Sequence, residues 1–347
     1  MASFPGERPE LDRLRAAGVE VHVRQRAVPT RVARWWRRLR GLAPVRLEDE
    51  IFGWVQAGRP DLVCVSQGGA LDGRPWMAGC HRRGLPYVVV VQAHTASSWP
   101  TASGLDELTA GYQGARSSYF VAARNRELLE DQLGVVLARA RQVRNPFHPS
   151  VPEAPLAWPD TADGYRLACV ARLDPPAKGQ DLLLKALAAE SWRERPVRVT
   201  FFGRGGAEEG LRRLSARLGL RGVTFAGHVG DIRRLWEEHH ALVLPSRYEG
   251  LPLSLVEAAW CGRPAVVTDV DGNTELVEEG RTGYVAEAAT VPFLAAALER
   301  AWRDRERWPA LGRAARQRAE SMFPRDPVEA FAEELVRVAG QGGVATA

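Results

Sequence analysis

The chain has 347 residues, of which 45% are hydrophobic and 26% are charged, a composition typical of an ordinary globular protein. The length predicts two domains, each large enough for its own core. The formal net charge of +5 is modest and would help to attract anionic ligands, but no arginine-rich block carries the signature of a nucleic-acid module, so we expect no nucleic acid as a partner.

Apolar strands alternate with amphipathic helices in the first half of the chain. The predicted strands are 19–24, 61–66, 87–93, 118–123 and 140–145, and the predicted helices are 8–17, 46–57, 73–83 and 125–133. Continuous apolar strands separated by such helices indicate a parallel sheet that is covered on both faces. Prolines then crowd the segment 145–159, where neither a helix nor a central strand can continue, so this segment is predicted to link two domains.

The same alternation restarts after the linker. The predicted strands are 166–173, 197–203, 223–227, 241–246, 264–269 and 282–286, and the predicted helices are 178–190, 207–218, 230–239, 253–261, 291–304, 307–321 and 326–338. This pattern indicates a second doubly wound unit, in which ligands bind beyond the carboxyl ends of the strands. We therefore predict an α/β protein with domains over 1–155 and 160–323, and a C-terminal helix and tail over 324–347.

Two glutamates eight positions apart, Glu249 and Glu257, are the most informative feature of the second unit. Glu249 is predicted on a loop, and Glu257 about one turn inside the helix that follows. At the start of that helix, the backbone N–H groups of Leu253 and Ser254 point outward, where the helix dipole also favours an anion. This layout suits the sugar, diphosphate and ribose of a sugar nucleotide. The alternative is a chance pair, because glutamate is a common helix residue.

Lysine is scarce in this chain, since only Lys178 and Lys185 of its 47 basic residues are lysines. Lys178 lies in a turn between the predicted strand 166–173 and a helix. A compact ammonium can act there as a point charge on a diphosphate. The alternative is a solvated helix start with incidental cations, and Lys185 is interpreted as a surface residue.

Several polar or small residues lie at the ends of predicted strands or shortly after them. The members of this group in the second unit are Arg172, Gly203, His228 and Glu249. Because the carboxyl ends of parallel strands lie at one edge of a sheet, these residues can converge on one crevice. His94 ends the predicted strand 87–93 and would face the same crevice if the first sheet follows this rule. Its alternative role is capping or packing.

The segment from Glu249 onward resembles the donor-binding half of the retaining glycosyltransferases of family 4. Their E-x7-E signature matches Glu249 and Glu257. The sequence D-G-N-T-E at 271–275 is similar to their G-G-x-x-E turn, with Asp271 in place of the usual glycine. The resemblance is strong over 165–286 and thin over 1–160.

The resemblance implies a GT-B fold, in which two doubly wound, Rossmann-like domains with parallel sheets face a cleft. It also implies that the last helix crosses back onto the first domain. Family members open with an apolar strand and a Gly-Gly loop, whereas residues 1–23 begin almost at a helix. A sheet without that strand would leave backbone groups unpaired. We therefore expect a first domain that lacks its first strand, in either an N-terminally shortened gene product or a degenerate transferase.

The resemblance also assigns roles to single residues. It implies that Arg172 and Lys178 hold the donor diphosphate and that Glu257 binds the ribose hydroxyls. Glu249 would orient the donor sugar, and His94 would lie near the reacting carbon.

Further donor contacts are implied around the base and the leaving group. Val229, beside His228, matches a position that contacts the base through its backbone, and the loop at Gly203 would lie near the donor or form a simple turn. The N–H groups of Leu253 and Ser254 would help to neutralise the departing diphosphate. Because fixed cations and a helix N-terminus would meet the diphosphate, we expect neither a metal nor a cofactor besides the sugar nucleotide.

These observations predict a metal-independent, retaining hexosyltransferase that moves a sugar from a nucleoside diphosphate sugar to a hydroxyl acceptor. The acceptor would be a glycan, a lipid-linked molecule or a small molecule. One alternative is a nucleotide-sugar-binding protein or an inactive, truncated relic. A lesser alternative is a GT-B nucleotide-sugar epimerase.

The compartment follows from the cysteines and from apolar segment lengths. The four cysteines are scattered without C-x-x-C spacing, which predicts buried free thiols in a reducing cytoplasm. No apolar run reaches the roughly 18 residues that a transmembrane helix needs. Residues 31–42 combine arginines with tryptophans at helical spacing, which suits peripheral contact with an anionic membrane on its inner face or, alternatively, packing into the first domain.

Overall fold

The computed structural model describes residues 9–22, 47–147 and 151–341, and the chain divides into a unit of residues 1–60 and a unit of residues 61–347. The first unit contains the helices α1 (Pro9–Ala16) and α3 (Leu47–Ala57). Within it, Trp54 donates its indole N–H to Glu20 over 2.9 Å. The predicted strand 19–24 is wrong for residues 19–22, which form no strand, and its last two residues lie outside the described ranges.

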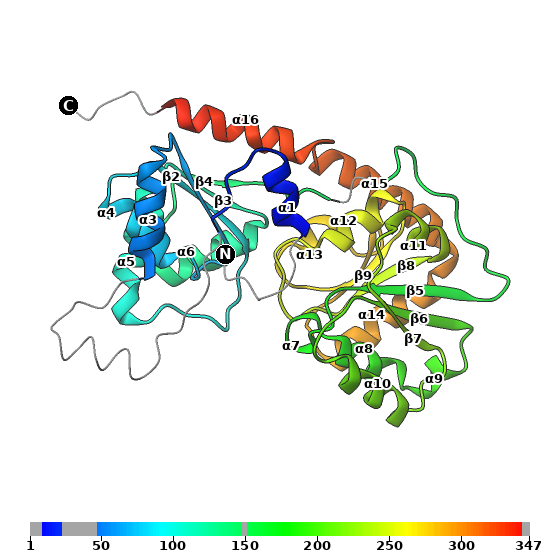
Figure 1. Cartoon of the computed structure of the whole chain (residues 1–347). Coiled ribbons are helices and arrows are strands. Elements are labelled where there is room, and N and C mark those ends of the chain that lie inside the picture. The colour runs from blue at the N-terminus through cyan, green and yellow to red at the C-terminus, as the bar shows by residue number, and fades with distance from the viewer. Residues whose placement is uncertain (1–8, 23–46, 148–150, 342–347) are drawn as a thin grey trace. The chain divides into compact units, whose positions relative to one another are not determined.

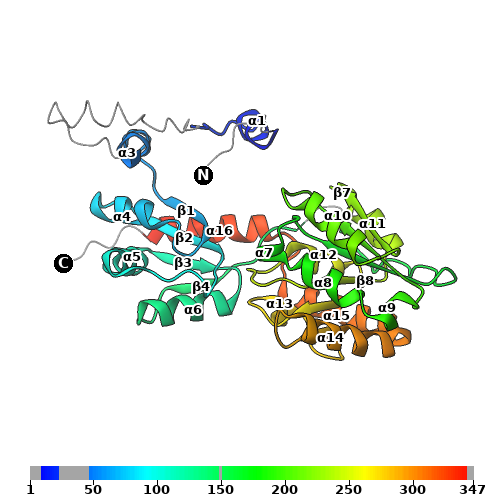
Figure 2. The ribbon, with the colours of Figure 1, turned by 90° about the horizontal axis from the view of Figure 1, so that it is seen from below.

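The second unit contains two parallel sheets. The first sheet has the order β1-β2-β3-β4 and consists of β1 (Val63–Gly69), β2 (Tyr87–Ala93), β3 (Ser117–Phe120) and β4 (Ala140–Gln142). Figure 2 shows these four strands side by side. Within the described ranges, β1 is an edge strand, so the expectation of a missing first strand stays a prediction.

Three helices connect the strands of this sheet: α4 (Arg74–Arg82), α5 (Ala102–Gly114) and α6 (Ala123–Leu133). The helix α5 was not predicted from the sequence. Its glycines explain the omission, because glycine is a poor helix former and yet allows close packing. A Cβ on Gly111 would lie 3.0 Å from Cβ of Met77 on α4, so the two helices approach closely where α5 carries no side chain.

The second sheet has the order β10-β9-β8-β5-β6-β7, with every pair parallel. Its strands are β5 (Tyr165–Val170), β6 (Val197–Phe202), β7 (Val223–Gly227), β8 (Ala241–Leu244), β9 (Ala265–Thr268) and β10 (Gly283–Ala286). All six coincide with predicted strands, within a few residues at their ends. The fold class is therefore confirmed as α/β with parallel sheets flanked by helices.

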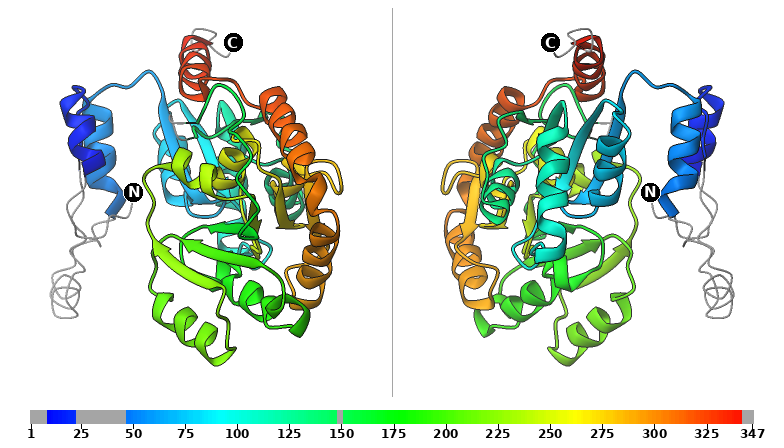
Figure 3. Two further views of the ribbon diagram at one scale, coloured as in Figure 1. Left: turned by 90° about the vertical axis from the view of Figure 1, so that its right-hand side faces the viewer. Right: turned by 90° about the vertical axis from the view of Figure 1, so that its left-hand side faces the viewer.

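Helices cover both faces of the second sheet. They are α7 (Pro175–Lys178), α8 (Gln180–Leu187), α9 (Glu190–Arg193), α10 (Glu208–Arg217), α11 (Ile232–Glu238), α12 (Leu253–Trp260), α13 (Asn273–Leu276), α14 (Val291–Arg303) and α15 (Trp308–Met322). The side chains of successive residues in β5 pack on opposite faces of the sheet. Leu167 and Cys169 belong to one apolar cluster, and Ala168 belongs to another. In Figure 3, α14 and α15 are the orange helices that run beside β10.

The last helix, α16 (Pro327–Gly340), packs on the first sheet rather than the second (Figure 1). Val338 is buried against Val88 and Val90 of β2. Tyr119 of β3 donates its hydroxyl to Glu334 over 2.8 Å and stacks edge to face with Phe331. The chain thus crosses between the two sheets a second time, after α15.

All four cysteines are free thiols, but Cys64 is exposed and not buried as predicted, because it lies on the exposed side of the edge strand β1. No helix in the described part of the chain is both long and apolar enough to cross a membrane. The basic segment 31–42 lies outside the described residues.

Candidate functional site

The loop from β8 to α12 places the glutamate pair. All four residues of β8 are buried, and Glu249 follows on a loop that ends at Pro252, whose fixed φ suits a helix start. The first helical bonds run to the carbonyl of Pro252 from Leu255 over 3.1 Å and from Val256 over 3.2 Å. The N–H groups of Leu253 and Ser254 therefore precede the hydrogen-bond ladder of α12, as the sequence predicts.

Lys178 and Glu249 lie together in a largely buried ion pair. Nζ of Lys178 is 2.6 Å from Oε2 of Glu249, and these side chains are 20% and 7% exposed. Ser246 donates its hydroxyl to the other oxygen, Oε1, over 2.7 Å. The ammonium carries three N–H donors, so one bond to Glu249 leaves it able to meet an anion as well.

A close contact of backbone groups fixes the position of Lys178. Gly179, which follows it, has φ +63°, and a Cβ there would lie 1.8 Å from the carbonyl oxygen of Pro245. Only glycine fits this position, so the turn is held directly against the end of β8. Arg247 pairs with both carboxylate oxygens of Asp181 in the next helix over 2.8 and 3.0 Å. Burial opposes the ionisation of Asp181, but the hydrogen bonds and charges of Arg247 and Lys185 together outweigh burial, and the pKa is lowered.

Arg172, Gly203 and Val229 follow β5, β6 and β7, which together with β8 occupy adjacent places in the sheet. The side chain of Arg172 is 67% exposed, and its Nη2 lies 3.1 Å from Oδ2 of Asp174. Gly203 has φ +135°, and a Cβ there would lie 2.0 Å from the carbonyl oxygen of Ala171, so the loops after β5 and β6 touch. The predicted donor residues thus lie at the carboxyl ends of adjacent strands. Their contacts with a donor stay predictions.

Glu257 lies inside α12 and is 8% exposed. Its backbone carbonyl accepts a hydrogen bond from Cys261 over 3.0 Å, which closes the last turn of the helix. A buried carboxylate needs hydrogen-bond partners to stay ionised, and ribose hydroxyls would supply further donors. Ribose binding by Glu257 stays a prediction.

His94 follows β2 and is only 2% exposed. Its Nε2 lies 2.9 Å from Oε1 of Gln132, so with the amide in this orientation Nε2 carries the proton and Nδ1 keeps its lone pair. Burial lowers the pKa of His94, which favours the neutral ring. The structure therefore presents His94 as a neutral imidazole, and its place beside a donor sugar stays a prediction.

Two residues that the sequence analysis gave no catalytic role join His94 to Glu249. The side-chain amide of Asn125 donates to the backbone carbonyls of His94 and Glu249 over 3.4 and 3.3 Å, and to the carboxylate of Asp271 over 3.1 Å. Asp271 in turn accepts the backbone N–H of Glu249 over 2.6 Å. The replacement of a glycine by Asp271 was visible in the sequence, but nothing there indicated Asn125.

The turn at 269–275 also holds the start of α6. Ala122 cannot cap this helix through its side chain, and Glu275 instead accepts the N–H of Ala123 over 2.6 Å. The same carboxylate pairs with Arg144 over 2.8 Å. Asp269 pairs with Arg124, so acidic side chains of the turn bind consecutive residues of the α6 N-terminus.

Over the described ranges, no group of three or more His, Cys, Asp or Glu side chains could hold a metal ion. His239 is instead bonded to the carbonyl of Leu235, and His240 accepts the N–H of Arg166. Metal independence stays a prediction.

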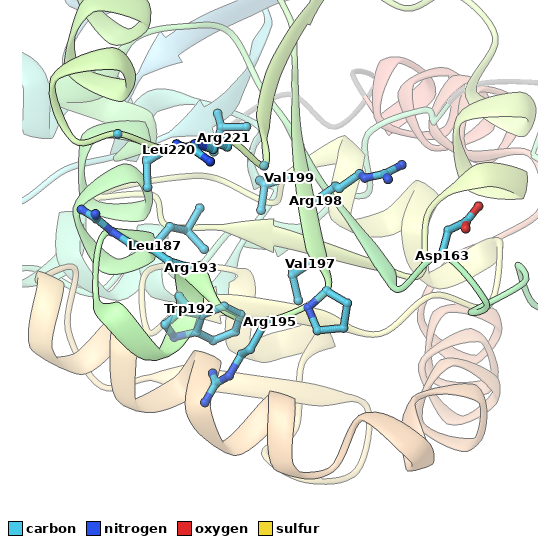
Figure 4. Close-up of a pocket in the computed structure, with 14 residues that line it drawn as sticks. Asp163, Leu187, Trp192, Arg193, Arg195, Val197, Arg198, Val199, Leu220 and Arg221 are labelled. Atoms are coloured by element: carbon cyan, nitrogen blue, oxygen red, sulfur yellow. The ribbon is translucent and has the colours of Figure 1, made fainter.

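A pocket of about 740 Å³ lies away from the predicted residues, at the amino ends of β6 and β7 (Figure 4). Its wall includes Trp192 and Arg195, and Figure 4 shows their side chains together at one end of the pocket. Arg195 is already engaged, because it stacks on Trp192 and binds both carboxylate oxygens of Glu299 over 2.7 and 2.9 Å. Because ligands of doubly wound sheets bind at the opposite, carboxyl ends, we do not assign the donor to this pocket.

The chain is similar to known glycosyltransferases in sequence. Residues 164–304 match the family model of the glycosyl transferases group 1. The α-D-kanosaminyltransferase of Streptomyces kanamyceticus is 35% identical over 132 residues, which are 37% of this chain and 34% of that protein. A GDP-mannose-dependent α-(1-6)-phosphatidylinositol monomannoside mannosyltransferase of Mycobacterium tuberculosis is 30% identical over 201 residues, which are 53% of this chain and 51% of that protein. The chain thus aligns with about a third to a half of the length of these relatives.

Solved structures extend the likeness to most of the chain. HepE of Anabaena, in complex with UDP and glucose, has a TM-score of 0.69 at 19% identity and covers 94% of this chain and 88% of its own. TarM of S. aureus has a TM-score of 0.62 at 18% identity and covers 78% of this chain and 54% of its own. At such identities the likeness establishes a shared fold. Residues 164–304 therefore resemble the glycosyl transferases group 1 in sequence, within a chain that has the GT-B fold.

Proposed function

We propose that this protein transfers a sugar from a nucleoside diphosphate sugar to a hydroxyl acceptor, with retention of the anomeric configuration. The observation that carries the proposal is the buried ion pair of Lys178 and Glu249, because it places a compact cation and the first glutamate of E-x7-E at one end of β8. The family match over 164–304 supports the same reaction class.

In the proposed reaction, the acceptor oxygen forms a bond to the anomeric carbon while the bond from that carbon to the diphosphate breaks. The acceptor attacks on the face from which the diphosphate leaves, and the hydroxyl proton passes to the departing phosphate oxygen. Lys178, Arg172 and the N–H groups at the start of α12 would stabilise the negative charge that develops on the leaving group. Glu249 would orient the donor sugar, and Glu257 would hold the ribose.

The relatives suggest which donors to try first. The mycobacterial relative is GDP-mannose-dependent by name, and solved structures of similar fold hold UDP or UDP-glucose. We therefore propose a thermal-shift screen of the protein against UDP-, GDP- and ADP-sugars. Stabilisation by one class would identify the donor base, and no stabilisation by any of them would contradict the proposed function.

Product analysis with glycan, lipid-linked and small hydroxyl acceptors would then separate the proposed function from its alternatives. A nucleotide-sugar-binding protein or inactive relic would bind the donor and form no product. An epimerase would change the sugar of the donor without any acceptor. Lys178→Ala should abolish transfer, and Lys185→Ala is the matched control, because Lys185 is 46% exposed and bound to Asp181.

Peripheral membrane contact through residues 31–42 is a separate proposal, which rests on the arginines and tryptophans of that segment. Sedimentation with vesicles of anionic phospholipid, compared with vesicles of neutral phospholipid, tests it. Binding to both kinds alike, or to neither, would contradict it.

A further inference from the structure

One side-chain amide connects the two residues to which the sequence assigns catalysis. Asn125 is fully buried, and its Nδ2 lies near the backbone carbonyls of His94 and Glu249. Nδ2 also donates to Oδ1 of Asp271, while Oδ2 of Asp271 accepts the N–H of Glu249. The peptide groups on both sides of Glu249 are therefore held by this pair of residues.

We propose that Asp271 is a positioning residue for the transfer reaction, which, together with Asn125, fixes the main chain of Glu249 relative to His94. The inference rests on the proposed function and deepens it. Neither Asp271 nor Asn125 needs to contact the substrate. Their effect on catalysis would come from the geometry of the residues that do.

The backbone at Asp271 supports this inference. Its φ is +43°, a conformation that glycine adopts freely and that costs other residues free energy. The resembling turn carries glycine at this position, and this chain carries a residue that is strained there. Strain of this kind persists where the side chain makes bonds that glycine cannot make. The two bonds to Glu249 and Asn125 are such bonds.

The charges around Asp271 add a second argument. Burial is the main cause that raises the pKa of Asp271 to about 6, and the negative charge of Glu249 acts in the same direction. Lys178 pairs with Glu249, and Arg124 pairs with Asp269. The charge of Arg124 still lowers the pKa of Asp271, but the hydrogen bonds to this carboxylate come from neutral groups. An ionised carboxylate in this environment lowers the free energy of unfolding. Residues that are retained for function often lower stability in this way.

The variant Asp271→Asn tests the proposal, because it keeps the size of the side chain and removes one of its two acceptor oxygens. We expect kcat for transfer to fall by on the order of tenfold to a hundredfold, with an unchanged affinity for the free nucleoside diphosphate. Asp271→Gly should show the same loss. Glu287→Gln is the matched control, because Glu287 is exposed and loses the same charge. The positioning role would be overturned if the kcat of Asp271→Asn equalled that of the parent protein. It would also be overturned if the variant lost nucleotide affinity by the same factor as kcat.

Hydrogen exchange provides a readout that does not depend on activity. The amide of Glu249 should exchange slowly in the parent and in Glu287→Gln, and faster in Asp271→Gly, which has no acceptor for it. Unchanged slow exchange in Asp271→Gly would overturn the inference even if transfer is confirmed. Failure of the parent to bind any sugar nucleotide would overturn the proposed function instead, while the exchange experiment would still decide whether Asp271 holds Glu249.

Discussion

The ammonium of Lys178 lies 2.6 Å from the carboxylate of Glu249, although 71 residues separate them in the chain. The lysine comes from the turn after β5 and the glutamate from the loop after β8, two strands that are neighbours in the sheet. The pair shows that charged residues from distant parts of the chain meet at the carboxyl ends of neighbouring parallel strands. Because both groups are mostly buried, small changes in either side chain should have measurable effects.

Lys178→Arg should lower the rate of donor turnover, even though the positive charge is kept. The planar guanidinium is larger than an ammonium and directs its donors differently, so it cannot reproduce the bond to Glu249 while meeting a diphosphate. The measurement is kcat/KM for the donor. Lys185→Arg serves as the control, since Lys185 is half exposed. Full activity in Lys178→Arg would show that the lysine is not required as such.

Glu257→Ala should raise the KM for the donor, with a smaller change in kcat. If the buried carboxylate binds ribose hydroxyls, its loss should cost on the order of 1 to 3 kcal/mol in donor binding. Steady-state kinetics with varied donor concentration measure the change, and Glu287→Ala tests for a nonspecific effect of losing an acidic residue. Equal donor KM in the parent and in Glu257→Ala would remove Glu257 from the donor site.

Transfer should continue in the presence of a chelator. In the proposed reaction the diphosphate is met by Lys178, Arg172 and the N–H groups that begin α12, so no divalent ion is needed for charge neutralisation. Rates measured with and without EDTA test this expectation. Loss of activity in EDTA, with recovery on addition of Mg²⁺ or Mn²⁺, would contradict metal independence.

Asp271→Asn should become more stable relative to the parent as the pH rises. The pKa of Asp271 is about 6 in the folded protein, against 3.8 as its ordinary value. The folded state therefore keeps a proton that the unfolded state loses in this interval, and ionisation of Asp271 lowers the free energy of unfolding by at most roughly 3 kcal/mol between about pH 4 and pH 6.

Asparagine does not ionise, so this loss should be absent in the variant. Thermal unfolding of both proteins at pH 4.5 and pH 7.5 measures the difference in Tm at each pH. A difference that stays constant with pH would show that the carboxylate is not destabilised by burial. A more stable but slower enzyme at pH 7.5 would match the positioning role.

The sequence predicted the second sheet well because its strands are short, mainly apolar runs such as β8 and β9, which alternate with helices and leave little ambiguity. It missed α5, where the helix contacts α4 through glycines and so lacks the usual apolar pattern. It predicted a strand over 19–24 because the residues alternate in polarity, yet residues 19–22 pair with no strand. Alternation alone does not supply a neighbouring strand.

Site residues also differ in whether a local sequence pattern reveals them. Lys178 and Glu249 could be predicted because strand ends and the E-x7-E spacing are local features. Asn125 could not, because its importance depends on contacts with His94, Glu249 and Asp271, which come from distant parts of the chain. A buried asparagine in a polar helix start has no pattern that distinguishes it from a surface residue.

The second crossing of the chain, before α16, has a mechanical consequence. The first crossing passes Phe147, and the second passes Phe323, whose ring lies 6.3 Å from that of Phe147. Val151 and Pro327 line one hollow there, so the two crossings run side by side. The two sheets are therefore joined by two connecting segments that lie next to each other. If one sheet moves against the other, two such connections would favour rotation about one line over sliding, because sliding would stretch both connections at once.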